Sequence, residues 1–197
     1  MNSRPVEIAE YQTRWPAEFL VIASRLREIL GSFAVRIDHI GSTSVPALAS
    51  KDIIDCQLTL ESFDGFDGVR ELLVRQAWQP RQGLHHDHLP PGDQHERDDY
   101  EKRYFREPIG HRRTHLHIRA AGRANQRYAI LFRDYLRAHP EAGLAYAATK
   151  RMVAHFHNRQ ADDSLFYEIK GPVCDMVMAP AEEWAGRVGW HPGATDA

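Results

Sequence analysis

The chain has 197 residues, 43% of them apolar, which is enough for one domain with a complete hydrophobic core. Its 25 basic and 27 acidic residues nearly cancel, so the composition favours neither a non-specific binder of nucleic acid nor a membrane-surface protein. The two cysteines, the polar first twenty residues and the lack of an apolar run of about 20 residues predict a cytoplasmic protein with reduced thiols.

The first part of the chain predicts helices that alternate with strands. Apolar residues at helical spacing after Pro16 predict a helix that ends at Gly31. Residues 35–40 alternate apolar and polar side chains, as a half-buried strand does, and a second strand is expected over 53–60. Another helix is expected over 66–77.

The connection between these two strands carries the most specific chemistry in the sequence. Gly41 lets the backbone approach a ligand closely, and Ser42 and Thr43 offer hydroxyls that can cap a short helix beginning near residue 45. Free amides at the start of a helix attract anions. In the second strand Asp55 shares one face with Gln57, so we expect the turn and the Asp55 carboxylate to face a common cleft.

Residues 83–102 hold glycine, two prolines and four histidines among many charges, which predicts a long exposed loop, either a lid or a disordered segment, rather than a metal cluster. Strands are expected near 104–105 and 114–118, and in the second of these His115, His117 and Arg119 share a face. Three helices follow, over about 125–138, 141–158 and 164–184.

These elements predict an α+β fold with a mixed β-sheet flanked by helices and a C-terminal helical half. We expect a single domain over residues 1–185, with a sheet-rich part to about 120, a helical part over 121–185 and a loose tail over 186–197.

Nucleotidyl transfer needs divalent cations held on carboxylates, and backbone or basic donors for the outer phosphates. Asp55 is the candidate carboxylate, and the position two residues later, where a second acid would share its face, holds Gln57. His115 and His117 are the candidates for the missing ligands, and imidazoles shift the preference from Mg²⁺ toward Zn²⁺, Mn²⁺ or iron. The alternatives are a histidine that only hydrogen-bonds a phosphate or the acid, and an Asp55 that caps the strand or pairs with Lys51.

Basic residues of the helical half are candidates for an anionic pocket. Arg133 and Arg137 lie four residues apart on one predicted helix, as do Tyr146 and Lys150 on the next. Residues with this spacing more often form a solvated or packed helix face.

Five segments of the chain strongly resemble the GrpB family over about residues 5 to 180: Tyr11-x-x-x-Trp15-Pro16, His39-Ile-Gly-Ser-Thr-Ser-Val-Pro46, Lys51-x-Ile-Ile-Asp55, His115-Leu-His117 and Arg133-Asp-Tyr-Leu-Arg-Ala-His-Pro140. The resemblance implies the nucleotidyltransferase-like fold, and in some proteins the family is fused to dephospho-coenzyme A kinase. It also implies a phosphate turn at Gly41, Ser42 and Thr43. Two positions depart from the family, with Ala47 where glycine is common and Asp52 where proline is common.

The resulting hypothesis is a nucleotidyltransferase-like protein that binds a small-molecule nucleoside triphosphate with Mg²⁺ or Mn²⁺, or alternatively Zn²⁺, and no nucleic acid or membrane. Its site residues would be Asp55 and His117 in catalysis, Asp55, His115 and His117 at the metal, and Gly41, Ser42, Thr43, Lys51, Arg133 and Lys150 at the phosphates. The rival hypotheses are a non-catalytic module that binds a nucleotide or a coenzyme A-like phosphate, and a metal-dependent hydrolase.

Overall fold

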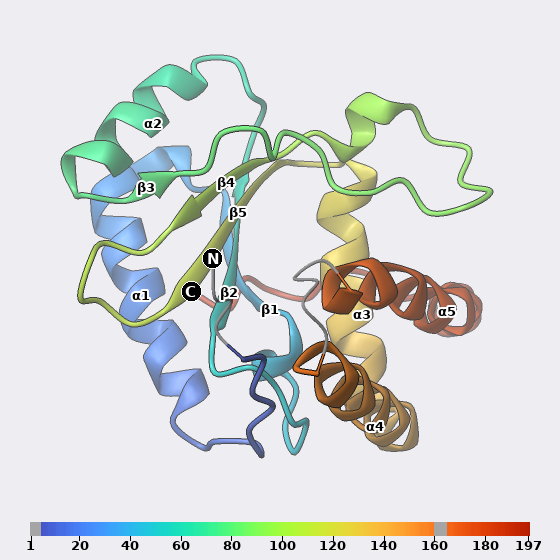
Figure 1. The fold of residues 1–197 in the computed structure, drawn as a ribbon. Coiled ribbons are helices and arrows are strands. Elements are labelled where there is room, and N and C mark those ends of the chain that lie inside the picture. Colours follow the sequence, from blue (N-terminus) through green and yellow to red (C-terminus); the bar gives the residue numbers. More distant parts are fainter. Residues whose placement is uncertain (1–4, 160–164) are drawn as a thin grey trace.

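A five-stranded mixed sheet with helices on both sides organises the computed structural model, which describes residues 5–159 and 165–197 (Figure 1). The helices are α1 (Trp15–Leu30), α2 (Phe66–Arg75), α3 (Ala124–Ala138), α4 (Pro140–His157) and α5 (Leu165–Val188). The strands are β1 (Arg36–Ile40), β2 (Ile54–Leu60), β3 (Gln79–Pro80), β4 (Arg103–Arg106) and β5 (Thr114–Ala120). The expected class, a mixed sheet flanked by helices with a helical half after the last strand, is confirmed.

The sheet has the order β1-β2-β5-β4-β3, and only β2 and β5 are parallel. Their register sets Asp55 beside His115 and Gln57 beside His117. Because successive side chains alternate between the two faces of a strand, Asp55, His115 and His117 project from the same face. The antiparallel pairing of β1 with β2 sets Ile40 beside Asp55, which brings the turn after β1 to that carboxylate.

The described residues form two large hydrophobic cores, one on a face of the sheet and one within the helical half. The helices α1 and α2 cover one face, and their apolar side chains pack on the buried residues Ile54, Cys56, Leu58, Leu116 and Ile118. The second core joins α3, α4 and α5 to the segment after the turn through Val45 and Leu48. The helical half therefore stands on the side of the sheet that carries Asp55 (Figure 1).

The connection between β1 and β2 differs from the expected helix near residue 45. A single 3₁₀ turn, Ser42–Ser44, begins directly after Gly41, and a β-turn follows in which the Leu48 amide donates to the Val45 carbonyl over 3.2 Å. Pro46 and Ala47 occupy the two central positions of this β-turn. Ala47 has φ +62°, a conformation that glycine adopts at much lower cost.

The end of the chain is not the loose tail that we expected. The helix α5 continues to Val188, and the Thr195 hydroxyl accepts from the Ile37 amide and donates to the Ile37 carbonyl. The Asp196 carboxylate accepts from the His39 amide over 2.8 Å. An edge strand leaves backbone donors and acceptors unpaired on its outer side, and these contacts satisfy several of those of β1.

The predicted start of the last helix at residue 164 lies outside the described residues. Among the helices of the described ranges, none is both long enough and apolar enough to cross a bilayer.

Candidate functional site

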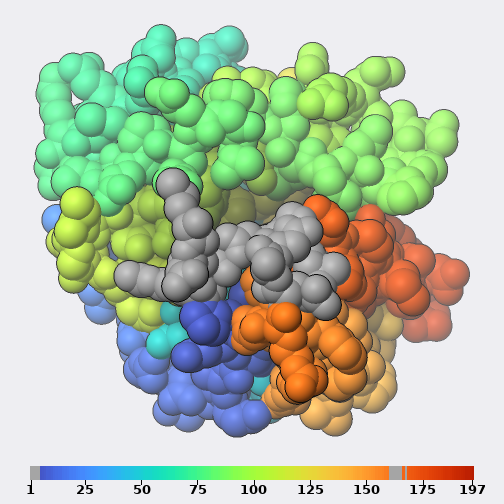
Figure 2. All heavy atoms as spheres, viewed as in Figure 1, coloured from blue at the N-terminus to red at the C-terminus, as the bar shows by residue number. Residues whose placement is uncertain are grey.

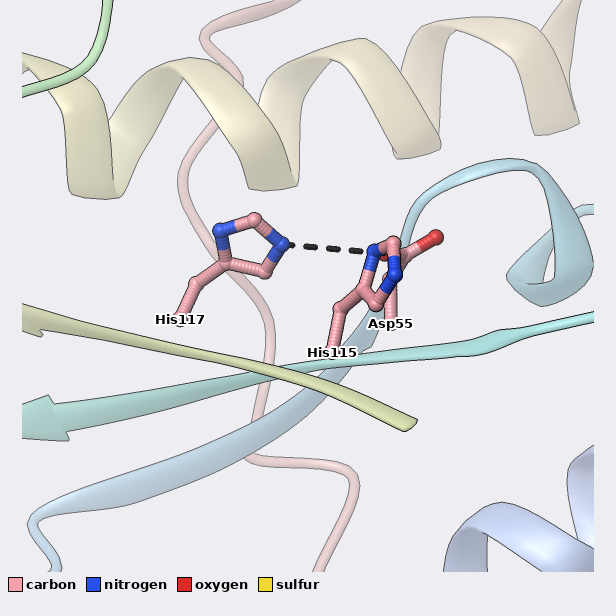
Figure 3. Close-up of side chains that lie close together, drawn as sticks. All are labelled: Asp55, His115 and His117. Atoms are coloured by element: carbon pink, nitrogen blue, oxygen red, sulfur yellow. Dashed lines mark ion pairs between the residues drawn. The ribbon is translucent and has the colours of Figure 1, made fainter. Parts of the chain in front are cut away.

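Three side chains from two neighbouring strands converge on the helical side of the sheet (Figure 3). The Oδ1 atom of Asp55 lies 3.0 Å from Nδ1 of His115 and 3.6 Å from Nε2 of His117. One nitrogen or oxygen atom from each of the three residues falls within 4.8 Å of the others, and within the described part of the chain this is the one such group of three or more potential metal ligands. The convergence follows from the parallel register of β2 and β5.

The turn after β1 touches the carboxylate of this cluster directly. Gly41 has φ +70°, and a Cβ atom added there would lie 2.9 Å from both Cβ and Cγ of Asp55. Only glycine has no side chain to place in that space. The turn and the acid therefore pack against each other at backbone level, and the 3₁₀ turn that follows places the Ser42 side chain at the same site.

A cavity of about 510 Å³ lies between the sheet and the helical half, over the Asp55 cluster. Gly41, Ser42, Lys51, Asp55, His115, His117 and Lys150, all predicted site residues, line it. The loop between β3 and β4, in green in Figure 2, forms the upper edge of this face, and α4 and α5, in orange and red, form the lower right edge.

The described lining of the cavity holds more basic than acidic residues, although the chain is nearly neutral. Among the described residues that line it, five are basic, namely Lys51, Lys102, Arg119, Lys150 and Lys170, and two are acidic, namely Asp55 and Asp87. Buried charges are expensive unless they are paired. This excess of positive charge favours an anionic ligand.

Lys150 shows the unbalanced charge most clearly. Its side chain is almost fully buried, and its Nζ donates to two neutral acceptors, Ser42 Oγ over 2.8 Å and the Ala49 carbonyl over 2.6 Å. Burial, assisted by the charge of Lys170, lowers the pKa of Lys150 to about 7. Burial also lowers the pKa of Lys51 to about 8, and the Lys51 Nζ stands 4.4 Å from the centroid of the Phe166 ring.

The Asp55 cluster is electrostatically suited to a cation at neutral pH. Burial alone would raise the pKa of Asp55, but hydrogen bonds from His115 and His117 reverse this effect and hold the pKa well below its usual value. Burial lowers the pKa of His117 to about 4. Asp55 is therefore an anion and His117 a neutral imidazole, which are the protonation states that metal coordination requires.

The donor set fits a divalent transition metal better than it fits Mg²⁺. Two imidazoles and one carboxylate are typical ligands of Zn²⁺, Mn²⁺ or Fe²⁺, whereas Mg²⁺ is held mainly by oxygen atoms. The buried Nδ1 of His117 has no hydrogen-bond partner among the described residues, whereas its Nε2 faces the Asp55 carboxylate, so the ring proton belongs on Nε2 when no ion is bound.

Two predicted phosphate ligands do not reach the cavity. The Thr43 side chain is fully buried, lies 3.0 Å from Nε2 of His39 and donates to the Ile53 carbonyl over 3.2 Å. Arg133 is 3% exposed and pairs with Asp134 and Asp196. Both residues brace the turn from behind, because Arg133 also donates to the His39 carbonyl. Helical spacing alone could not show that α3 presents Arg133 to the edge of β1.

Arg137 also supports the turn without lining the cavity. Its guanidinium donates twice to the Ser44 carbonyl, over 3.0 and 2.9 Å. By contrast, Tyr146 and Lys150, the pair predicted on the next helix, both line the cavity. Asp52 projects away from it and is held by Arg14 and by the Trp15 indole.

Gln57, which stands where a second acid would be expected, is fully buried and committed to other contacts. Its amide nitrogen donates to the Gln126 carbonyl over 3.1 Å, and its oxygen accepts from Arg119. Arg119 in turn pairs with Asp87, which also accepts from Lys102. Asp87 and Lys102 were missed because they lie in and beside the loop that we expected to be exposed, while the two-residue period of β5 did place Arg119 on the face of His115.

The described architecture has a nucleotidyltransferase-like fold, a mixed sheet flanked by helices. Its sheet and helices superpose on Cid1 in complex with its short product ApU with a TM-score of 0.50 at 12% identity, over 80% of this chain and 45% of that one, a likeness that shows the fold alone. A closer match is the conserved protein GrpB from Enterococcus faecalis, with a TM-score of 0.69 and 26% identity over 90% of this chain and 99% of that one.

The family model described as GrpB protein matches residues 5–179, and the chain belongs to the GrpB family. Similar sequences include a dephospho-CoA kinase of Mycolicibacterium paratuberculosis, 31% identical over 95% of this chain and 49% of that protein. The UPF0157 protein YqkA of Bacillus subtilis is 32% identical over 98% of this chain and 50% of that protein, and the UPF0157 protein BH1888 of Halalkalibacterium halodurans is 32% identical over 91% and 84%. The chain thus spans about half the length of the first two of these relatives.

Proposed function

We propose that this chain binds a nucleoside triphosphate together with a divalent metal ion and transfers its nucleotidyl group to a small acceptor. The observation that carries the proposal is the single cavity in which the Asp55, His115 and His117 cluster meets five basic side chains. A triphosphate is the abundant small ligand whose charge matches both features, since it binds a divalent cation and needs further cationic donors.

Asp55, His115 and His117 would hold the ion. When bound there, the ion would neutralise charge on the phosphates and polarise the reacting phosphoryl group. If Asp55 and His115 suffice as protein ligands, the neutral His117 can instead take a proton from the acceptor at the ring nitrogen that carries no hydrogen.

The phosphates would lie along the turn and the lysines. The first amides of a helical turn have no partner within that turn, so those that follow Gly41 are donors for phosphate oxygens. Lys150 and Lys51 would add positive charge on the side of the cavity away from the sheet. An anion beside Lys150 would also supply the counter-charge that its two neutral partners do not.

Calorimetric titration with Mn²⁺ and a non-hydrolysable triphosphate analogue tests this proposal. We expect wild type to bind the analogue only when Mn²⁺ is present, and Asp55→Asn to lose that dependence. The matched control is Asp52→Asn, which removes an acid three residues earlier that points away from the cavity. Equal Mn²⁺-dependent binding by wild type and Asp55→Asn would remove Asp55 from the site.

The presence of Gln57 in place of a second acid favours a second candidate function, a module that binds a phosphorylated ligand without catalysis. Transfer by two metal ions requires more carboxylate than Asp55 provides, and both ends of the Gln57 amide already bond to Gln126 and Arg119. The relatives named dephospho-CoA kinase make a coenzyme A-like ligand one candidate for such a module. Binding without Mn²⁺, and no product from a panel of triphosphates and acceptors, would favour this second function.

A further inference from the structure

Two buried atoms, on residues that line the same cavity as Asp55, have complementary hydrogen-bonding needs and no partner in this structure, each other included. Within the described residues, four buried side-chain nitrogen or oxygen atoms make no hydrogen bond, and they include Nδ1 of His117 and Oδ1 of Asn125. An imidazole nitrogen can donate, whereas an amide oxygen can only accept. Leaving either atom unpaired costs about 1–3 kcal/mol, so each calls for an explanation.

The orientation of the Asn125 amide is fixed by its other end. Asn125 is 2% exposed, and its Nδ2 donates to Asp87 over 3.1 Å and to the Glu101 carbonyl over 2.9 Å. Both of these partners are acceptors, so the nitrogen must be the atom that faces them. The oxygen is therefore the free end of the amide.

Several contacts bring this amide to the His117 side of the sheet. Gln57 is the register partner of His117, and its side chain reaches the carbonyl of Gln126, the residue after Asn125. Arg119, two residues after His117 on the same face of β5, shares Asp87 with Asn125. In Figure 3, α3 passes over the face of the sheet from which His117 projects. The start of α3 thus lies over the row of Gln57 and His117.

We infer that Asn125 is a positioning residue for His117, whose Nδ1–H donates to Asn125 Oδ1 when the Nε2 lone pair faces a metal ion. The inference rests on the metal site of the proposed function. Without an ion, Nε2 of His117 is directed at Asp55, so the ring proton belongs on Nε2. With an ion the proton must move to Nδ1, which then requires an acceptor.

This arrangement agrees with general experience of metal sites. A metal-binding histidine donates its other ring N–H to an oxygen acceptor, which fixes both the tautomer and the orientation of the ring. His115 differs, because its Nδ1 already faces Asp55 at 3.0 Å. Asn125 therefore positions only His117, and the ring of His115 provides an internal reference in the same measurement.

Zn²⁺ titration and ¹⁵N NMR of the imidazole rings test the inference without any activity measurement. In Zn²⁺-loaded wild type, we expect a protected proton on Nδ1 of His117. Asn125→Leu removes the acceptor, and we expect it to lower Zn²⁺ affinity about 10–100-fold and to expose that proton to solvent exchange. The His115 ring signals should keep their bound pattern.

Asn125→Asp separates this role from a merely structural one. Both variants lose the two bonds from Nδ2, and the aspartate also sets an oxygen against Asp87 and the Glu101 carbonyl, but it keeps an oxygen acceptor on its other side. Asn125→Asp should therefore bind Zn²⁺ more tightly than Asn125→Leu. Equal affinity in wild type and Asn125→Leu, or metal bound through Nδ1 of His117, would overturn the inference while leaving the proposed function intact. Wild type that binds no ion would overturn both. If Asn125→Leu does not fold, a rapidly exchanging Nδ1 proton in loaded wild type is sufficient to refute the inference.

Discussion

The contact between Gly41 and Asp55 predicts that Gly41→Ala is unusually destabilising. A methyl group at this position would meet Asp55 Cβ and Cγ at 2.9 Å and Oδ2 at a shorter distance still. The positive φ of +70° adds about 1–2 kcal/mol for any L-residue other than glycine. Displacing the Asp55 side chain, whose Oδ1 faces both His115 and His117, adds about 1–3 kcal/mol. We therefore expect a total loss of about 2–5 kcal/mol.

Gly110→Ala is the matched control for this experiment. Gly110 has φ +79° and no atom within 4 Å of an added Cβ, so its substitution carries the backbone cost without the contact. Urea unfolding of both variants should show Gly41→Ala to be less stable by about 1–3 kcal/mol, which corresponds to about 2–4 °C in Tm for each kcal/mol. Equal losses in the two variants would refute the close packing of turn and acid on which the site depends.

Three other substitutions test separate parts of the structure. Ala47→Gly should raise the free energy of unfolding by about 0.5–1 kcal/mol, because it relieves φ +62° at an exposed position; urea denaturation measures this gain. Because burial lowers the pKa of Lys150 to about 7, the unfolded chain binds more protons between about pH 7 and its ordinary pKa near 10.5, so wild-type stability should rise with pH in that window. Lys150→Met should flatten that rise in unfolding curves measured at several pH values, and a rise of equal size would contradict the burial argument. Arg133→Met should cost about 1.5–3 kcal/mol, since it removes the charged hydrogen bonds of Arg133 to Asp134 and Asp196, but should not change triphosphate affinity in calorimetry.

Periodicity was sufficient to predict the sheet face that carries the candidate site. Asp55, His115 and His117 fall at alternate positions of short strands bounded by turn residues, and such local patterns determine which way each side chain points. The sequence gives no register between β2 and β5, because pairing depends on packing between segments that are far apart in the chain. The 3.0 Å distance between Asp55 and His115 is therefore a result of the tertiary structure, although the sheet face from which each side chain projects was predictable.

The helical half was harder to assign, for a physical reason. A helix period shows which residues share a face, but several faces of α3 are buried against different neighbours. Arg133 faces the edge of β1, whereas Asn125, at the start of the same helix, reaches the cavity. The loop over 83–102 is largely exposed, as its polar composition predicts, but that composition does not show that Asp87 pairs with Lys102 and Arg119. A polar composition predicts solvent exposure only for charged residues that have no ion-pair partner in the fold.

The near-zero net charge of the chain and the cationic cavity are compatible. The net charge affects the approach of large polyanions, whereas the charges in the cavity act on a ligand only after it has entered. Exposed charges are screened beyond about 8 Å at physiological salt, so the overall balance governs encounter with large polyanions. Lys150 and Arg119 are buried, and buried charges are screened much less. A ligand small enough to enter the cavity therefore meets a strong local field, while an extended nucleic acid meets a nearly neutral surface. For this reason the affinity for a triphosphate should fall only weakly with added salt, and a steep fall measured by calorimetry would place the binding site on the surface instead.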